Sequence, residues 1–156
     1  MDIIVDRALN YGFWVFGGYV RDVVVCGQTK YNDIDIGCSW DQMNLLSKFI
    51  GDAKILDDTL ERTGRTRHIV YPFVRRIIKL ESIDIIVFSS FQDFLNQPLD
   101  VSCNLFYLLQ GRLYTRGKRD YTELTKQRKF VTFEYISEGR KRKLLDNGWS
   151  EAFGSV

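Results

Sequence analysis

Two aspartates stand two positions apart in the segment Asn32-Asp33-Ile34-Asp35-Ile36, and this spacing is typical of a metal site on a strand. Residues two apart on a β-strand point to the same side, so both carboxylates would reach one spot. Like charges this close favour a cation, and Mg²⁺ prefers such oxygen ligands, commonly sharing them with substrate phosphates. A third acid, Asp84, lies inside an otherwise apolar run, where it is costly unless paired or metal-bound. We therefore expect Asp84 to join Asp33 and Asp35 as a metal ligand.

A glycine pair, Gly17-Gly18, separates the strand-like run Phe13–Phe16 from a helix expected over Tyr19–Val25. Glycines at such a junction let the backbone approach a ligand, and the N–H groups of a first helical turn favour phosphate. Arg21 falls in that turn, where a guanidinium can contact phosphate oxygens through two hydrogen bonds. The junction is therefore predicted to hold a triphosphate.

Each feature alone has an ordinary explanation. An isolated pair of aspartates is more often a solvated face than a metal site, and most glycine pairs are merely turns. The combination of glycine pair, nearby arginine, spaced aspartates and a later strand-borne aspartate is far more specific. It favours a joint site for metal and nucleotide.

These residues resemble a known family. The segments Gly17–Asp22 (GGYVRD) and Asn32–Ile36 (NDIDI) are similar to the head domain of the DNA polymerase β superfamily of nucleotidyltransferases. Within it, the resemblance is to the class that contains bacterial tRNA CCA-adding enzymes and bacterial poly(A) polymerases. Asp100–Leu105 and Gly117–Asp120 resemble two later motifs of that class. The resemblance covers about residues 13–130.

The resemblance implies Mg²⁺-dependent transfer of a nucleoside monophosphate from ATP or CTP to a hydroxyl, with an RNA 3′ end as the expected acceptor. It implies two Mg²⁺ ions, or Mn²⁺ in their place, held by the three aspartates, with Asp84 activating the attacking hydroxyl. The nucleotide-binding residues that it implies are Gly17, Gly18, Arg21, Asp100 and Asn104.

The chain also departs from this class. Pro98-Leu99 stands where the class usually has two arginines, and the helical neck that follows the head is absent or reduced to the last residues. A protein partner or a second copy of the chain would then replace the missing RNA-gripping domains. Two alternatives stay open: nucleotidylation of a protein or small molecule, and an inactive module that binds nucleotide, RNA or protein. The lost arginines favour inactivity, whereas the three aspartates oppose it.

Composition sets outer limits. The chain has 156 residues, which predicts one domain over residues 1–156, with 45% hydrophobic and 27% charged residues and a net charge of +2. No apolar run approaches the roughly 18 residues that span a bilayer, so we expect a cytoplasmic protein without membrane contact. The three cysteines form no CxxC pair, which predicts free thiols and no zinc site.

Apolar spacing predicts an α/β (α+β) fold, in which helices flank a small mixed β-sheet. The strands expected besides Phe13–Phe16 are 34–38, 68–73, 74–80, 82–88, 105–109 and 112–114. The further helices expected are 2–10, one capped by Ser39 or Asp41 and running to about 50, a short one at 92–95, then 120–128 and a basic segment at about 134–147.

Basic and aromatic residues have two interpretations each. The basic residues between Arg62 and Lys79 line an RNA or triphosphate path, or form a solvated face. The same choice applies to the basic run Gly139–Lys143. We expect Trp14, Tyr71 and Phe73 in the core, and Tyr19 as the aromatic most exposed at the cleft.

Overall fold

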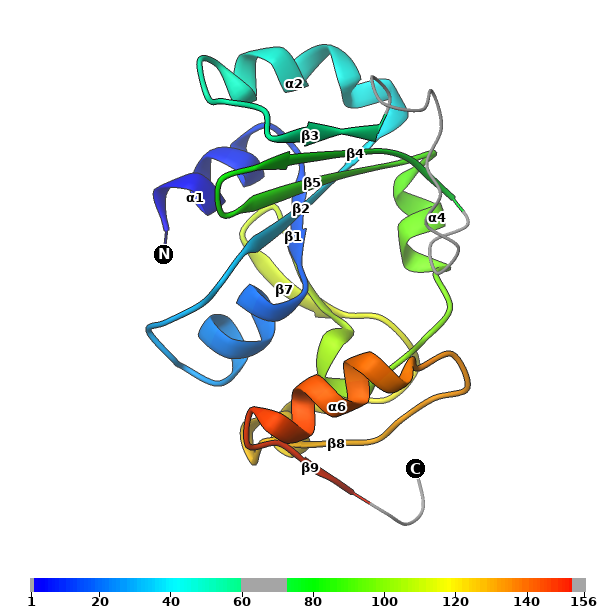
Figure 1. Cartoon of the computed structure of the whole chain (residues 1–156). Helices are drawn as coiled ribbons and strands as arrows, with labels where there is room; N and C mark the ends of the chain where they lie inside the picture. Colours follow the sequence, from blue (N-terminus) through cyan, green and yellow to red (C-terminus); the bar gives the residue numbers. More distant parts are fainter. Residues whose placement is uncertain (1, 60–72, 153–156) are drawn as a thin grey trace.

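The computed structural model describes residues 2–59 and 73–152, and its centre is a seven-stranded sheet with the strand order β3-β4-β5-β2-β1-β6-β7 (Figure 1). The strands are β1 Trp14–Phe16, β2 Ile34–Ser39, β3 Asp57–Asp58, β4 Val74–Leu80, β5 Ile83–Phe88, β6 Phe106–Leu109 and β7 Arg112–Thr115. Every neighbouring pair is antiparallel except β2 and β5, which run parallel. The predicted mixed sheet is confirmed.

Short helices connect the strands. They are α1 Ile3–Asn10, α2 Met43–Ile50, α4 Phe91–Leu95, α5 Thr122–Lys126 and α6 Glu138–Asp146, together with the π-helix η1 Val20–Val25 and the 3-10 turns η2 Trp40–Gln42 and η3 Ser102–Asn104. Side chains cap the N-termini of two of these helices. The Asp2 carboxylate accepts from the Ile4 N–H at 2.7 Å at the start of α1, and the Ser90 hydroxyl accepts from a backbone N–H at the start of α4.

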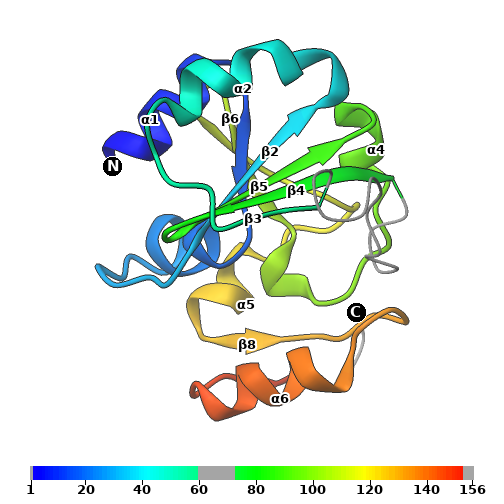
Figure 2. The same cartoon turned by 45° about the horizontal axis from the view of Figure 1, so that its top comes forward.

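The two faces of the sheet have separate apolar cores because side chains alternate along each strand. Val15, Ile36 and Ile85 belong to a core shared with α1, η1 and α2. Trp14 and Phe16 lie on the opposite face, where they pack around Phe94 of α4. Both helix layers are visible in Figure 2.

A second layer lies beside the sheet and is built from the C-terminal part of the described chain. β8 Lys129–Phe130 pairs in parallel with β9 Ser150–Glu151, and α6 packs alongside them (Figures 1 and 2). The core of this layer consists of Val101, Cys103, Phe130, Leu144 and Trp149. The layer is joined to η3 by the N–H of Val131, which donates to the buried Ser102 hydroxyl at 2.9 Å.

Most predicted elements are confirmed, with corrections at their ends. The basic helix begins at Glu138 rather than at 134, because Ser137 caps it by accepting from the Arg140 N–H. Ser82 takes a positive φ of 62° in the tight turn expected between β4 and β5. The strand expected at 68–73 falls, apart from Phe73, outside the described residues, as does Tyr71.

Two aromatic predictions are wrong. Tyr19 is 2% exposed and belongs to the core, whereas Phe73 is 43% exposed in a turn. Tyr19 packs edge-to-face against Tyr31, which is 36% exposed. The exposed aromatic side chain at the cleft is therefore Tyr31, in the role that the sequence predicted for Tyr19.

The three cysteines are free, as predicted, and burial raises the pKa of the Cys38 and Cys103 thiols to about 12. Among residues 2–59 and 73–152, no helix has both the length and the apolar character needed to span a bilayer.

Candidate active site

The glycine pair lies directly against one of the predicted metal ligands. Gly17 follows β1 with a positive φ of 75°, a conformation that glycine adopts without steric cost. A Cβ atom at Gly17 would lie 2.2 Å from Oδ2 of Asp35, so no larger residue fits there without moving that carboxylate. A Cβ atom at Gly18 would lie 3.2 Å from Nη2 of Arg21. Two motifs that are 18 residues apart in sequence thus form one surface.

The parallel pairing of β2 with β5 brings the three aspartates into one cleft. Asp35 on β2 is the register partner of Asp84 on β5, and Asp33 stands just before β2. Ile34, between the two aspartates of the motif, is buried in the opposite core, which places Asp33 and Asp35 on the same face as Phe16. Burial, then the charges of Asp84 and Asp33, raise the pKa of Asp35 to about 7. Ionised Asp35 is therefore poorly hydrated and lies close to two further acids.

Lys79, the last of the basic residues for which the sequence left two interpretations open, stands beside these acids. Nζ of Lys79 lies 3.1 Å from Oδ1 of Asp84 and 3.9 Å from Oδ2 of Asp33. Lys79 is directly opposite Asp84 in the antiparallel β4–β5 register. The hydrogen bond and the charge of Asp84 raise the pKa of Lys79. The strand pairing, which sequence alone did not fix, is the signal that identifies it.

The donor set fits a hard divalent cation that is completed by its substrate. Within the two described ranges, no three acidic, histidine or cysteine side chains form a group that could hold a metal ion by itself. Mg²⁺ usually binds one or two carboxylates and takes its remaining ligands from phosphates and water. Asp33 and Asp35 can supply such carboxylates. Burial and the neighbouring acids raise the pKa of Asp35, and a bound cation would favour its ionised form.

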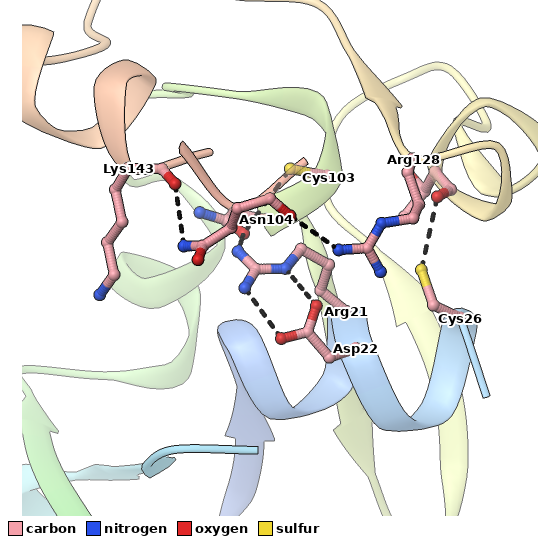
Figure 3. Close-up of polar contacts among 9 residues, drawn as sticks. Arg21, Asp22, Cys26, Cys103, Asn104, Arg128 and Lys143 are labelled. Atoms are coloured by element: carbon pink, nitrogen blue, oxygen red, sulfur yellow. Dashed lines mark hydrogen bonds and ion pairs between the residues drawn. The ribbon is translucent and has the colours of Figure 1, made fainter. Parts of the chain in front are cut away.

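Arg21 is already held by neighbouring side chains. Its Nε and Nη2 donate to the two carboxylate oxygens of Asp22 at 2.8 and 3.0 Å, and its Nη1 donates to Oδ1 of Asn104 at 3.0 Å (Figure 3). The structure thus joins Arg21 and Asn104, which lie 83 positions apart and were both predicted to bind nucleotide. In this arrangement Arg21 links η1 to η3, and its contact with phosphate stays a prediction.

Asp100 connects the sheet layer to the C-terminal helix. Its Oδ2 lies 2.9 Å from Nε of Arg140 on α6, and its Oδ1 accepts from the N–H of Val101 at 2.7 Å. Arg140 belongs to the basic run for which the sequence left two interpretations open. The structure directs this arginine at the cleft rather than at solvent alone.

All eight predicted site residues line one cleft of about 770 Å³. Basic side chains from the second layer and the β7 region line its other wall; they are Arg116, Arg128, Arg140 and Lys143. The guanidinium carbons of Arg21 and Arg128 both lie over the ring of Trp149, 5.5 and 5.0 Å from its centroid. The cleft therefore has an acidic floor and a basic wall, a suitable charge arrangement for a metal-bound triphosphate.

The basic residues on β4 divide between two roles. Arg75 stacks 4.5 Å over the ring of Trp40, and Arg76 pairs with the buried Asp58 at 2.6 Å. Neither lines the cleft, whereas Lys79 reaches the aspartates. Arg62, Arg65, Arg67 and His68 fall outside the described residues.

Comparison with known proteins gives a match at the level of the fold. A CCA-adding enzyme solved in complex with CTP superposes with a TM-score of 0.53 at 16% identity, over 96% of this chain and 43% of that one. A CCA-adding enzyme in its apo form gives 0.50 at 17% identity, over 91% and 42%. No model of a known protein family and no curated protein sequence matches.

The chain thus has a nucleotidyltransferase-like fold and spans less than half the length of the two enzymes it superposes on. At this identity the likeness shows the fold alone.

Proposed function

We propose that this chain is a metal-dependent nucleotidyltransferase that moves a nucleoside monophosphate from an NTP to a hydroxyl group. One observation supports this most strongly: Asp35 and Asp84 are register partners on adjacent parallel strands, Asp35 lies against Gly17, and Asp33 lines the same cleft. Structural stability alone gives no reason to gather three acids at one spot, because each raises the cost of ionising the others.

The chemistry assigned to the cleft is an in-line displacement. The acceptor hydroxyl oxygen forms a bond to the α-phosphorus, the bond from that phosphorus to the bridging oxygen breaks, and pyrophosphate leaves. Asp84 would accept the hydroxyl proton, and Asp33, Asp35 and Asp84 would hold the Mg²⁺ ions. When bound, these ions would neutralise charge on the triphosphate and on the entering and leaving oxygens.

The protein's own contribution is positioning. The Gly17-Gly18 backbone can approach the triphosphate closely because neither residue carries a side chain of its own. Arg116, Arg128 and Lys143 line the same cleft and compensate for the arginine pair that Pro98-Leu99 replaces. Asn104 and Asp100 keep Arg21 and Arg140 in place at the sides.

For the substrates we propose ATP or CTP and an RNA 3′ end. The fold neighbour with bound CTP supports a nucleoside triphosphate, and the basic wall supports an acceptor that carries phosphates. Because the chain spans less than half of the CCA-adding enzymes, a protein partner or a second copy would supply the remaining grip on RNA.

One observation favours a second candidate, a module that binds nucleotide without chemistry. Lys79 already neutralises part of the charge on Asp84 and Asp33. An ammonium group that stayed there permanently would leave no room for a cation next to Asp84.

Incubation of the protein with each α-labelled NTP, Mg²⁺ and total RNA separates these functions. Labelled RNA supports the proposal. Labelled protein or a labelled small molecule would show that the acceptor is not RNA, and the absence of any label favours the binding module. The double variant Asp33→Ala/Asp35→Ala must abolish labelling. As a matched control, Asp6→Ala/Asp52→Ala removes two carboxylates outside the cleft and should label like the wild type. Equal labelling by wild type and the Asp33/Asp35 variant would refute the assignment.

A further inference from the structure

We propose that Lys79 holds the place of a divalent cation between Asp33 and Asp84, so that an ion binding there must displace its ammonium group. This inference rests on the proposed function and adds to it a residue that controls how readily the site takes up metal. The lysine acts on the ligands and does not contact the reacting atoms.

The geometry places the ammonium where a bridging cation would go. Nζ of Lys79 lies 3.1 Å from Oδ1 of Asp84 and 3.9 Å from Oδ2 of Asp33, so one positive charge serves carboxylates from two strands. The β4–β5 register holds Lys79 opposite Asp84, and the β2–β5 register holds Asp84 beside Asp35. A row of three neighbouring strands therefore fixes the lysine next to all three acids.

The ion pairs of Lys79 with Asp84 and Asp33 can also be broken at little cost. The side chain of Lys79 is 46% exposed, as is that of Asp33, so the ammonium group can return to water at little cost. Lysine has a flexible chain and a compact charge, unlike Arg76, whose planar group is held on the buried Asp58 by two hydrogen bonds. Lys79 can therefore leave when a doubly charged ion arrives and return when it departs.

Two consequences follow for the metal-free protein. The ammonium group lowers the repulsion between Asp84 and Asp33, because it lies close to both carboxylates. It also weakens the uptake of free metal, since each ion must compete with the ammonium group. A nucleotide that brings its own Mg²⁺ adds further ligands and overcomes this competition.

The experiment measures Mn²⁺ binding without nucleotide, by the loss of the free-ion EPR signal. Lys79→Met removes the charge but keeps an unbranched chain of similar length. The expected result is about fivefold tighter Mn²⁺ binding, the factor that corresponds to removing one exposed ion pair from the competition. Lys79→Arg retains the charge and should bind no tighter than the wild type. Lys48→Met makes the same chemical change on the exposed side of α2 and should leave binding unchanged.

The outcomes separate this inference from the proposed function. Saturable binding that Asp33→Ala/Asp35→Ala abolishes but Lys79→Met leaves equal or weakens overturns the role of Lys79 and leaves the metal site standing. No saturable binding by wild type or Lys79→Met also overturns the role of Lys79, whereas the labelling experiment with NTP and Mg²⁺ decides the proposed function by itself. Circular dichroism and urea unfolding of each variant show whether the fold is retained, because a lost fold would weaken binding rather than tighten it.

Discussion

Replacement of Gly17 by alanine tests the contact that joins the glycine turn to the aspartates. Two costs arise. The positive φ of 75° costs a residue with a Cβ atom about 1–2 kcal/mol. The added Cβ, 2.2 Å from Oδ2 of Asp35, also forces the carboxylate off its preferred rotamer, which costs about 0.5–1.5 kcal/mol more.

Gly27 provides a matched control because it has nearly the same φ, 72°, and no atom within 4 Å of its would-be Cβ. Gly27→Ala should therefore show only the backbone cost. In a chain of this size each kcal/mol lowers Tm by about 2–4 °C. Urea and thermal unfolding of both variants measure the difference directly.

The displaced carboxylate should also disturb the site. We expect Gly17→Ala to bind Mn²⁺ on the order of tenfold more weakly, the usual effect of mispositioning a metal ligand, and Gly27→Ala to bind like the wild type. Equal losses of stability in the two variants, together with equal Mn²⁺ affinities, would show that the Gly17–Asp35 contact does not shape the site.

Three further predictions concern stability. Asp35→Asn should stabilise the protein by a few kcal/mol at pH 8 but not at pH 4. The pKa of Asp35 is raised to about 7 in the folded protein, so its ionisation destabilises the folded state progressively between pH 4 and 7. Urea unfolding over this pH range measures the effect. Trp149→Ala should cost about 3–5 kcal/mol, since the ring is 4% exposed, and a loss below about 1 kcal/mol would contradict its place in the second core. Ser102→Ala leaves the Val131 N–H without its acceptor and should cost about 1–3 kcal/mol in the same assay, more than removal of the exposed Ser137 cap; the opposite order would refute it.

Local pattern was enough for most elements. Alternation of Ile34 and Ile36 with acids predicted β2, and the two apolar runs at 105–109 and 112–114 predicted β6 and β7. Ends were less predictable: composition alone placed the start of α6 at 134, whereas the Ser137 cap decides it. The prediction that Tyr19 is exposed was wrong for another reason: its burial depends on the packing of η1 against the sheet.

For the candidate site, the sequence by itself determined the chemical groups: two aspartates on one side of a strand, a third within an apolar strand, and a glycine pair able to approach a ligand. Their spacing is local, so periodicity and residue type reveal it. Only the tertiary structure decided that Asp84 lies beside Asp35, that Arg21 is bound by Asp22 and Asn104, and that Lys79 stands among the acids. Those contacts depend on which strands pair and in what register, and strand pairing is set by the burial of both sheet faces together rather than by any one segment.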